Sequence, residues 1–112
     1  MKDGILLRIY IGESDKVGGK PVYRRIVELC RKEGIAGATV LRGMLGYGKS
    51  SVIHNSSILR LSADLPVVVE IVDEIEKIEK IKGKLTEIVK EGLITEEKVK
   101  IVKYTGRDTT SE

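Results

Sequence analysis

One segment combines glycines, cations and hydroxyls in a pattern that suits anion binding. Residues 42–51 read RGMLGYGKSS, which brings together three glycines, two cations and two hydroxyls. Glycine lets backbone N–H groups approach an anion closely and permits positive φ, and successive N–H groups can form an anion-binding nest. A phosphate group therefore fits this segment.

The spacing matches neither of the two best-known phosphate motifs. It lacks the full Walker pattern followed by a helix, and it is not the dinucleotide fingerprint GxGxxG. A plainer alternative is a hairpin tip that needs glycine for its turns. The residues alone leave both interpretations open.

The remaining reactive side chains predict neither catalysis nor a metal site. His54 is the only histidine, and no Cys, Asp or Glu lies near it at metal-ligand spacing, so we expect a solvated loop residue or a ligand contact across a subunit boundary. Cys30 falls on the apolar side of a predicted helix, which indicates a buried, inert thiol. The serines have no paired base in the sequence. We therefore expect a protein that is not an enzyme.

Four strands and two helices are expected to position these groups. Alternating apolar residues indicate strands, and apolar residues at helical spacing indicate amphipathic helices. The expected strands are Ile5–Ile11, Ala36–Arg42, Val67–Val72 and Lys98–Tyr104, and the expected helices are Pro21–Glu33 and Asp73–Lys90. Gly34 is the expected stop of the first helix. Residues 43–57 form a long loop, apolar alternation resumes at residues 58–61, and residues 105–112 form a frayed tail.

The element order βαββαβ predicts an α+β, ferredoxin-like fold, with two helices on one face of a four-stranded antiparallel sheet. The opposite face is expected to carry these apolar residues: Leu6, Tyr10, Val68, Val72, Val102 and Tyr104. Such a set requires a covering partner, and self-association is the simplest one. Arg8 and Glu70 would share this face and pair with each other.

Composition bounds the protein class. The 112 residues suit one domain spanning 1–112, and the net charge is only +3. Residues 1–60 carry eleven basic and five acidic groups, against nine and twelve in residues 61–112, which permits an anionic ligand near the first half but does not indicate nucleic-acid binding. The lone cysteine, and the absence of an apolar run long enough for membrane insertion, predict a cytoplasmic protein.

Several segments together resemble a known family. They are residues 7–13 (LRIYIGE), 19–21 (GKP), 42–48 (RGMLGYG) and 61–73 (LSADLPVVVEIVD). This combination resembles the PII-like family of uncharacterised prokaryotic proteins, over residues 5–104. The resemblance implies a homotrimer whose sheets face inward, and a regulatory role without catalysis.

The resemblance also implies an adenine nucleotide as effector, held between subunits, with no required cofactor. The positions that correspond to nucleotide-binding segments are Arg42, Gly43, Gly46, Tyr47, Gly48, Lys49, Gly92, Leu93, Lys103, Tyr104 and Arg107. The acidic surroundings of Gly92 would repel a triphosphate, which favours AMP or ADP over ATP. Residues 49–57, including Ser50, Ser51, His54 and Asn55, would form the loop that contacts a protein target such as a membrane transporter.

Two alternatives share the architecture. One is a trimeric interaction protein that binds no nucleotide and recognises a protein through its loop. The other is a trimeric metal-binding protein like the CutA group, for which only His54 and Cys30 offer soft ligands.

Overall fold

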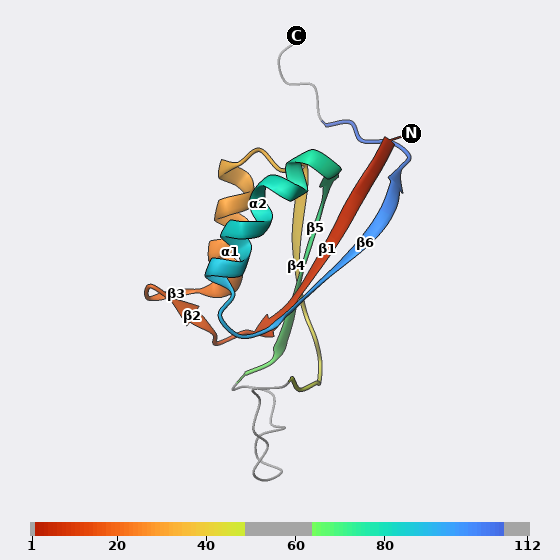
Figure 1. The fold of residues 1–112 in the computed structure, drawn as a ribbon. Helices are drawn as coiled ribbons and strands as arrows, with labels where there is room; N and C mark the ends of the chain where they lie inside the picture. The colour runs from red at the N-terminus through yellow and green to blue at the C-terminus, as the bar shows by residue number, and fades with distance from the viewer. Residues whose placement is uncertain (1, 49–63, 107–112) are drawn as a thin grey trace.

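The computed structural model describes residues 2–48 and 64–106 (Figure 1). Its elements, in chain order, are β1 (Lys2–Gly12), β2 (Lys16–Val17), β3 (Lys20–Pro21), α1 (Val22–Lys32), β4 (Gly37–Arg42), β5 (Pro66–Glu74), α2 (Ile75–Ile88) and β6 (Leu93–Ile101). The expected long loop beyond residue 48 and the alternation at residues 58–61 lie outside the described residues.

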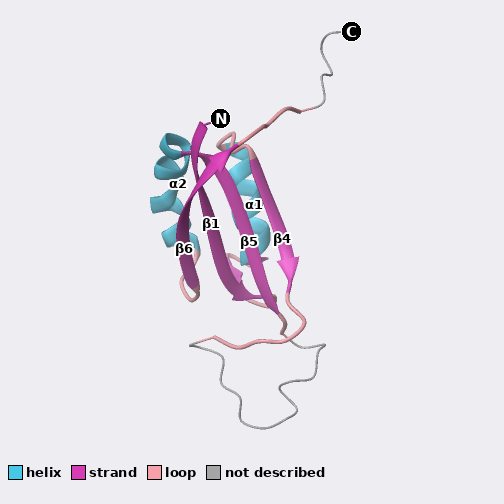
Figure 2. Ribbon diagram, turned by 90° about the vertical axis from the view of Figure 1, so that its right-hand side faces the viewer, coloured by secondary structure: helices cyan, strands magenta, loops and turns pink. Residues whose placement is uncertain are grey.

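The four long strands form one antiparallel sheet in the order β4-β5-β1-β6. Helices α1 and α2 lie against one face of this sheet, and Figure 2 shows that none of the described elements covers the other face. The ferredoxin-like prediction is therefore confirmed. The short strands β2 and β3 form a separate hairpin between β1 and α1.

The core lies between the sheet and the two helices, because every second residue of the central strands points toward the helices. Ile9, Val69 and Ile71 are fully buried, and α1 and α2 cover them with Ile26 and Ile78. The predicted alternation of β1 and the predicted apolar sides of both helices are thus confirmed. Cys30 belongs to the same core, as expected for an inert thiol.

Predicted boundaries differ from the structure most clearly at three elements. The fourth strand runs from Leu93 to Ile101 instead of Lys98–Tyr104, because pairing with β1 extends from Tyr10 back to Lys2. The second helix begins at Ile75, since residues 73 and 74 still pair with β1 as part of β5. Pro21 belongs to β3 and precedes the first helical residue.

The uncovered face of the sheet, which we call the open face, is apolar at its ends and charged at its centre. In one row across the strands, Leu41 lies opposite Val68, which lies opposite Tyr10, which lies opposite Leu93. Tyr10, Leu41 and Leu93 are 40%, 48% and 56% exposed. Val102 and Tyr104 were expected on this face, but they follow the end of β6 and lie outside the sheet.

Candidate ligand site at the two ends of the sheet

The glycine-rich segment begins where β4 ends, and its first glycines pack against the start of β5. Gly43 N–H donates to the carbonyl of Pro66 at 2.7 Å. A Cβ at Gly43 would lie 2.9 Å from Pro66 Cγ, and one at Gly46 would lie 3.2 Å from the same atom. Close approach to Pro66 therefore explains these two glycines. Gly43, Gly46 and Gly48 do not have positive φ.

Arg42 is already paired at this end of the sheet, which we call the loop end. Its Nη2 atom donates to Glu13 Oε2, and this ion pair crosses the start of β5. The chain returning into β5 is bound to the same turn, because Glu13 N–H donates to the carbonyl of Leu65 at 2.8 Å. Both ends of the long loop are thus attached to the residues that follow β1.

The next residues of the segment project from the loop end. Met44, Leu45 and Tyr47 are 87%, 67% and 80% exposed. Tyr47 and Gly48 are two of the predicted nucleotide contacts. The predicted nucleotide contacts Lys49 and Arg107 lie outside the described residues. So do the residues predicted to contact a protein target: Ser50, Ser51, His54 and Asn55.

Gly92 and Leu93 also lie at the loop end, because Leu93 pairs with Tyr10, close to the end of β1. Gly92 has φ +151, and a Cβ there would lie 2.6 Å from the carbonyl oxygen of Tyr10. The fold therefore requires glycine at residue 92 with or without a ligand. Leu93 is the first residue of β6 rather than a loop residue, and its side chain lies on the open face.

Lys103 and Tyr104 lie at the opposite end of the sheet. The chain leaves β6 there and crosses toward the start of β4, where the Tyr104 hydroxyl donates to the carbonyl of Ala36 at 3.0 Å. We call residues 102–106 the strap. A cavity of about 380 Å³ lies beside it, lined by Lys2, Ala36, Gly37, Val72, Asp73, Glu74, Ile101, Val102, Lys103 and Tyr104. This volume falls in the range of small-molecule sites.

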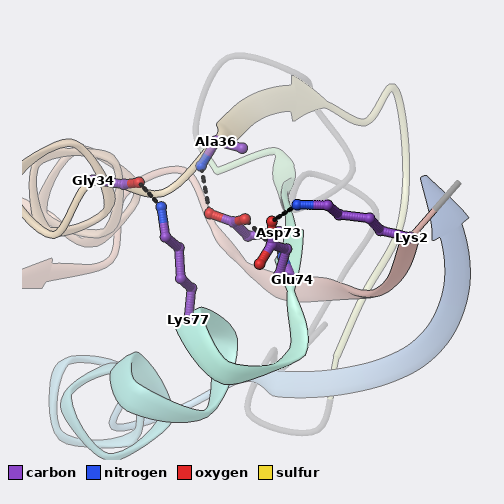
Figure 3. Close-up of polar contacts among 6 residues, drawn as sticks. All are labelled: Lys2, Gly34, Ala36, Asp73, Glu74 and Lys77. Carbon is purple, nitrogen blue, oxygen red and sulfur yellow. Dashed lines mark hydrogen bonds and ion pairs between the residues drawn. The ribbon is translucent and has the colours of Figure 1, made fainter. Parts of the chain in front are cut away.

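One of the residues that line this cavity is a buried carboxylate. Asp73 is 4% exposed, and its two oxygens accept hydrogen bonds from Ala36 N–H at 2.8 Å and from Glu74 N–H at 2.6 Å. Figure 3 shows these residues with the ion pair of Lys2 and Glu74 beside them, whose N and O atoms lie 2.9 Å apart. Since Tyr104 holds the carbonyl of the same Ala36, both backbone groups of this residue are bound by side chains.

Sequence reasoning missed the role of Asp73, because it assigned this residue to the start of the second helix. The available signal was a single carboxylate directly after the apolar run of residues 67–72. A carboxylate at a strand end often accepts bonds from neighbouring backbone N–H groups.

One chain does not bring the predicted nucleotide contacts together. The step of eight residues from Leu93 to Ile101 along β6 corresponds to about 26 Å. Residues 42–48 and 92–93 lie at the loop end, whereas Lys103 and Tyr104 lie at the strap end. Within one chain, the described members of the two sets lie too far apart for a small ligand to contact both.

The described part of the chain contains no group of three or more His, Cys, Asp or Glu residues arranged to hold a metal ion. Burial raises the pKa of the Cys30 thiol to about 11, so this sulfur remains protonated at neutral pH. Among residues 2–48 and 64–106, no helix is long and apolar enough to cross a membrane.

The sheet order and the two helices on one face define an α+β protein with a PII-like, ferredoxin-like fold. The chain belongs to the DUF190 family, described as Uncharacterized ACR, COG1993, whose model matches residues 4–101. The predicted resemblance to the PII-like family of uncharacterised proteins is thereby confirmed.

Relatives of similar length support this assignment. A UPF0166 protein of Aquifex aeolicus is 45% identical over 101 residues, covering 87% of this chain and 91% of the relative. A UPF0166 protein of Methanocaldococcus jannaschii is 44% identical over 90 residues, covering 80% and 82%.

Solved structures of CPII from Thiomonas intermedia K12 show the same fold. The structure bound to ADP and bicarbonate has a TM-score of 0.60 at 15% identity and covers 90% of both chains. The structure bound to ADP, AMP and acetate has a TM-score of 0.53 at 15% identity and covers 91% of both chains.

Proposed function

We propose that this protein is a cytoplasmic, non-catalytic regulator of the PII type. It binds AMP or ADP between the chains of a homotrimer and acts on a partner protein through the long loop. The observation that carries this proposal is the separation of the two sets of predicted contacts. Residues 42–48 and 92–93 lie about 26 Å from the strap, so a shared ligand needs the loop end of one chain and the strap end of its neighbour.

The open face supports self-association. Its apolar rows favour cover by a second copy of the chain, and at its centre Arg8 is hydrogen-bonded to both Glu70 and Glu97, so each of these charges has a partner. In a closed ring of three chains, every loop end meets one strap end. This arrangement would yield three equivalent ligand sites.

The charges of the described residues favour a ligand with one or two phosphates. A cation lies at each end: Arg42, which is paired with Glu13, at the loop end, and Lys103 at the strap end. Near Gly92, the acidic residues Glu96 and Glu97 already hold ion pairs with Lys82 and Arg8. The cations left for a ligand are thus few, which disfavours a triphosphate.

Binding is tested by isothermal titration of nucleotide-stripped protein with AMP, ADP, ATP and cyclic nucleotides, with the mass determined by light scattering. We expect a trimer with one saturable AMP or ADP site per chain. Gly46→Val, which adds bulk beside Pro66, should abolish binding at the loop end and leave the trimer intact. Unchanged affinity in that variant would remove Gly46 from the site.

Subunit mixing tests whether the site is shared. Lys103→Glu should abolish binding at the strap end, where Lys103 lines the cavity. Neither variant binds alone, but chains of both kinds, unfolded and refolded together in equal amounts, should regain about a quarter of the sites, because each site takes its two halves from two different chains. A site within one chain would regain none. Each variant refolded by itself is the control.

The loop end also favours a second candidate function. The exposed apolar side chains of Met44, Leu45 and Tyr47 are typical of a protein-docking element. A trimer that binds no nucleotide in the titration would favour an interaction protein that recognises its partner through this segment.

A further inference from the structure

The ion pair of Glu13 with Arg42 links two strands that are not neighbours. Arg42 ends β4, Glu13 follows β1, and β5 lies between these strands in the sheet. The Glu13 side chain is 29% exposed and the Arg42 side chain is 63% exposed, so the carboxylate is the more enclosed partner. An anion that approaches Arg42 meets a cation whose charge is already compensated.

Hydrogen bonds donated by backbone N–H groups hold the turn at Glu13 in place, and the Glu13 side chain takes no part in them. Glu13 N–H donates to the carbonyl of Leu65 at 2.8 Å, and Ser14 N–H donates to Asp64 Oδ1 at 3.0 Å. A substitution at Glu13 that keeps the side-chain shape leaves both of these bonds intact. The charge at this position can therefore be changed without releasing the loop end.

The neighbouring carboxylates have structural tasks that Glu13 does not share. Asp15 Oδ2 accepts a hydrogen bond from Gly12 N–H at 2.9 Å, and Asp64 accepts the bond from Ser14. Among the described residues, Glu13 is the acid whose side chain is paired with Arg42. This selects Glu13 as the residue that decides how much of the Arg42 charge a ligand can use.

We propose that Glu13 is an internal competitor for Arg42 and that it sets the negative charge a ligand must bring to the loop end. A guanidinium group offers a planar fork of donors that binds a carboxylate or a phosphate in the same manner. A phosphate group therefore displaces Glu13 from the fork, whereas a neutral nucleoside leaves the pair intact. This inference rests on the proposed function, and it assigns Glu13 as a determinant of ligand charge at that same site.

The test compares Glu13→Gln with the unaltered protein in titrations with adenosine, AMP and ADP. Exposed ion pairs contribute little, so we expect AMP and ADP to bind about two- to fivefold more tightly to the variant. Adenosine should bind equally to both proteins, because it has no group that competes for the fork. Raising the salt concentration should reduce the gain for AMP and ADP.

Glu28→Gln is the matched control. It removes the same charge from another exposed ion pair, in which Glu28 on α1 lies 3.6 Å from Lys20 on β3, and it should leave all three affinities unchanged. If Glu13→Gln binds AMP as tightly as the unaltered protein or more weakly, Glu13 does not compete for Arg42, although the proposed nucleotide site is unaffected. An equal gain for adenosine would overturn this competition as well, since the effect would then be independent of charge. Failure of both proteins to bind any of the three ligands would overturn the nucleotide site and the competitor together, whereas AMP binding seen only in Glu13→Gln would support the competitor.

Discussion

Arg8 on β1 lies directly opposite Glu70 on β5, and its Nε atom donates to Glu70 Oε2 at 3.2 Å. The same guanidinium donates through Nη1 to Glu97 on β6 at 2.8 Å. These hydrogen bonds to Glu97 and Glu70 raise the pKa of Arg8 above its ordinary value. One cation is therefore shared by two carboxylates at the centre of the open face.

This network yields a test of whether copies of the chain cover the open face. Arg8→Met leaves Glu70 and Glu97 without a counter-charge, so association through this face should weaken at least about tenfold. Light scattering over a concentration series should show the mass falling toward that of one chain. Lys84→Met breaks the exposed pair of α2 with Glu33 on the helix side of the sheet and should leave the mass unchanged. Equal masses for both variants would show that the open face is not the interface.

Replacing Asp73 should destabilise the fold. Asp73→Ala removes the acceptor of Ala36 N–H and of Glu74 N–H, and leaving such groups unpaired costs about 1–3 kcal/mol. Asp73→Asn keeps one acceptor oxygen and should lose less. Urea unfolding measures both changes. Glu74→Gln, at an exposed pair, is the control, and a loss in that variant as large as in Asp73→Ala would contradict the structural role of Asp73.

Two glycines should respond to alanine in opposite directions. Gly92→Ala forces a Cβ to within 2.6 Å of the Tyr10 carbonyl oxygen at φ +151 and should lower the free energy of unfolding by about 1–3 kcal/mol. Gly83→Ala meets nothing within 4 Å in the interior of α2 and should raise it by about 0.5–1 kcal/mol. Thermal or urea unfolding of both variants checks the pair. A loss at residue 83 or a gain at residue 92 would disagree with the observed backbone.

Because Cys30 is buried, the free energy of unfolding should fall at alkaline pH. Its pKa is raised from 9.0 to about 11 by burial, so the unfolded chain loses this proton first as the pH rises. The stabilisation that results from this difference in pKa is about 3 kcal/mol. It is fully present below pH 9 and is lost as the pH rises from 9 to about 11.

The measurement is the free energy of unfolding of the reduced protein from pH 8 to about pH 11, compared with Cys30→Ala. The variant is less stable at pH 8 because it leaves a cavity, but the difference between the two proteins should shrink as the pH rises. A constant difference across this range would mean that the folded protein does not hold the thiol proton more tightly than the unfolded chain.

Periodic patterns made most of the fold predictable. Ile5, Leu7 and Ile9 alternate with Leu6, Arg8 and Tyr10 because one face of β1 packs on the helices and the other does not. The apolar sides of both helices are equally readable, and the pairing of Arg8 with Glu70 followed from their places on adjacent strands.

The last strand resisted prediction for a physical reason. In β6 only Ile94, Val99 and Ile101 are partly buried, and charged residues lie on both faces of this edge strand. Its hydrophobic alternation is therefore weak, and hydrogen bonding to β1 decides where the strand begins and ends. The misplaced boundary put Val102 and Tyr104 on the sheet, whereas they follow the end of β6 and belong to the strap.

The glycine-rich segment was visible in the sequence because glycine, arginine and lysine gather there within a few residues. The relationships that define the site were not visible, since they join residues far apart in the chain. Arg42 meets Glu13 across β5, and Asp73 and Tyr104 hold Ala36 from two other elements. Local residue patterns determined the elements and the candidate ligand chemistry, but the order of strands in the sheet decided which side chains meet, because sheet neighbours are set by tertiary packing.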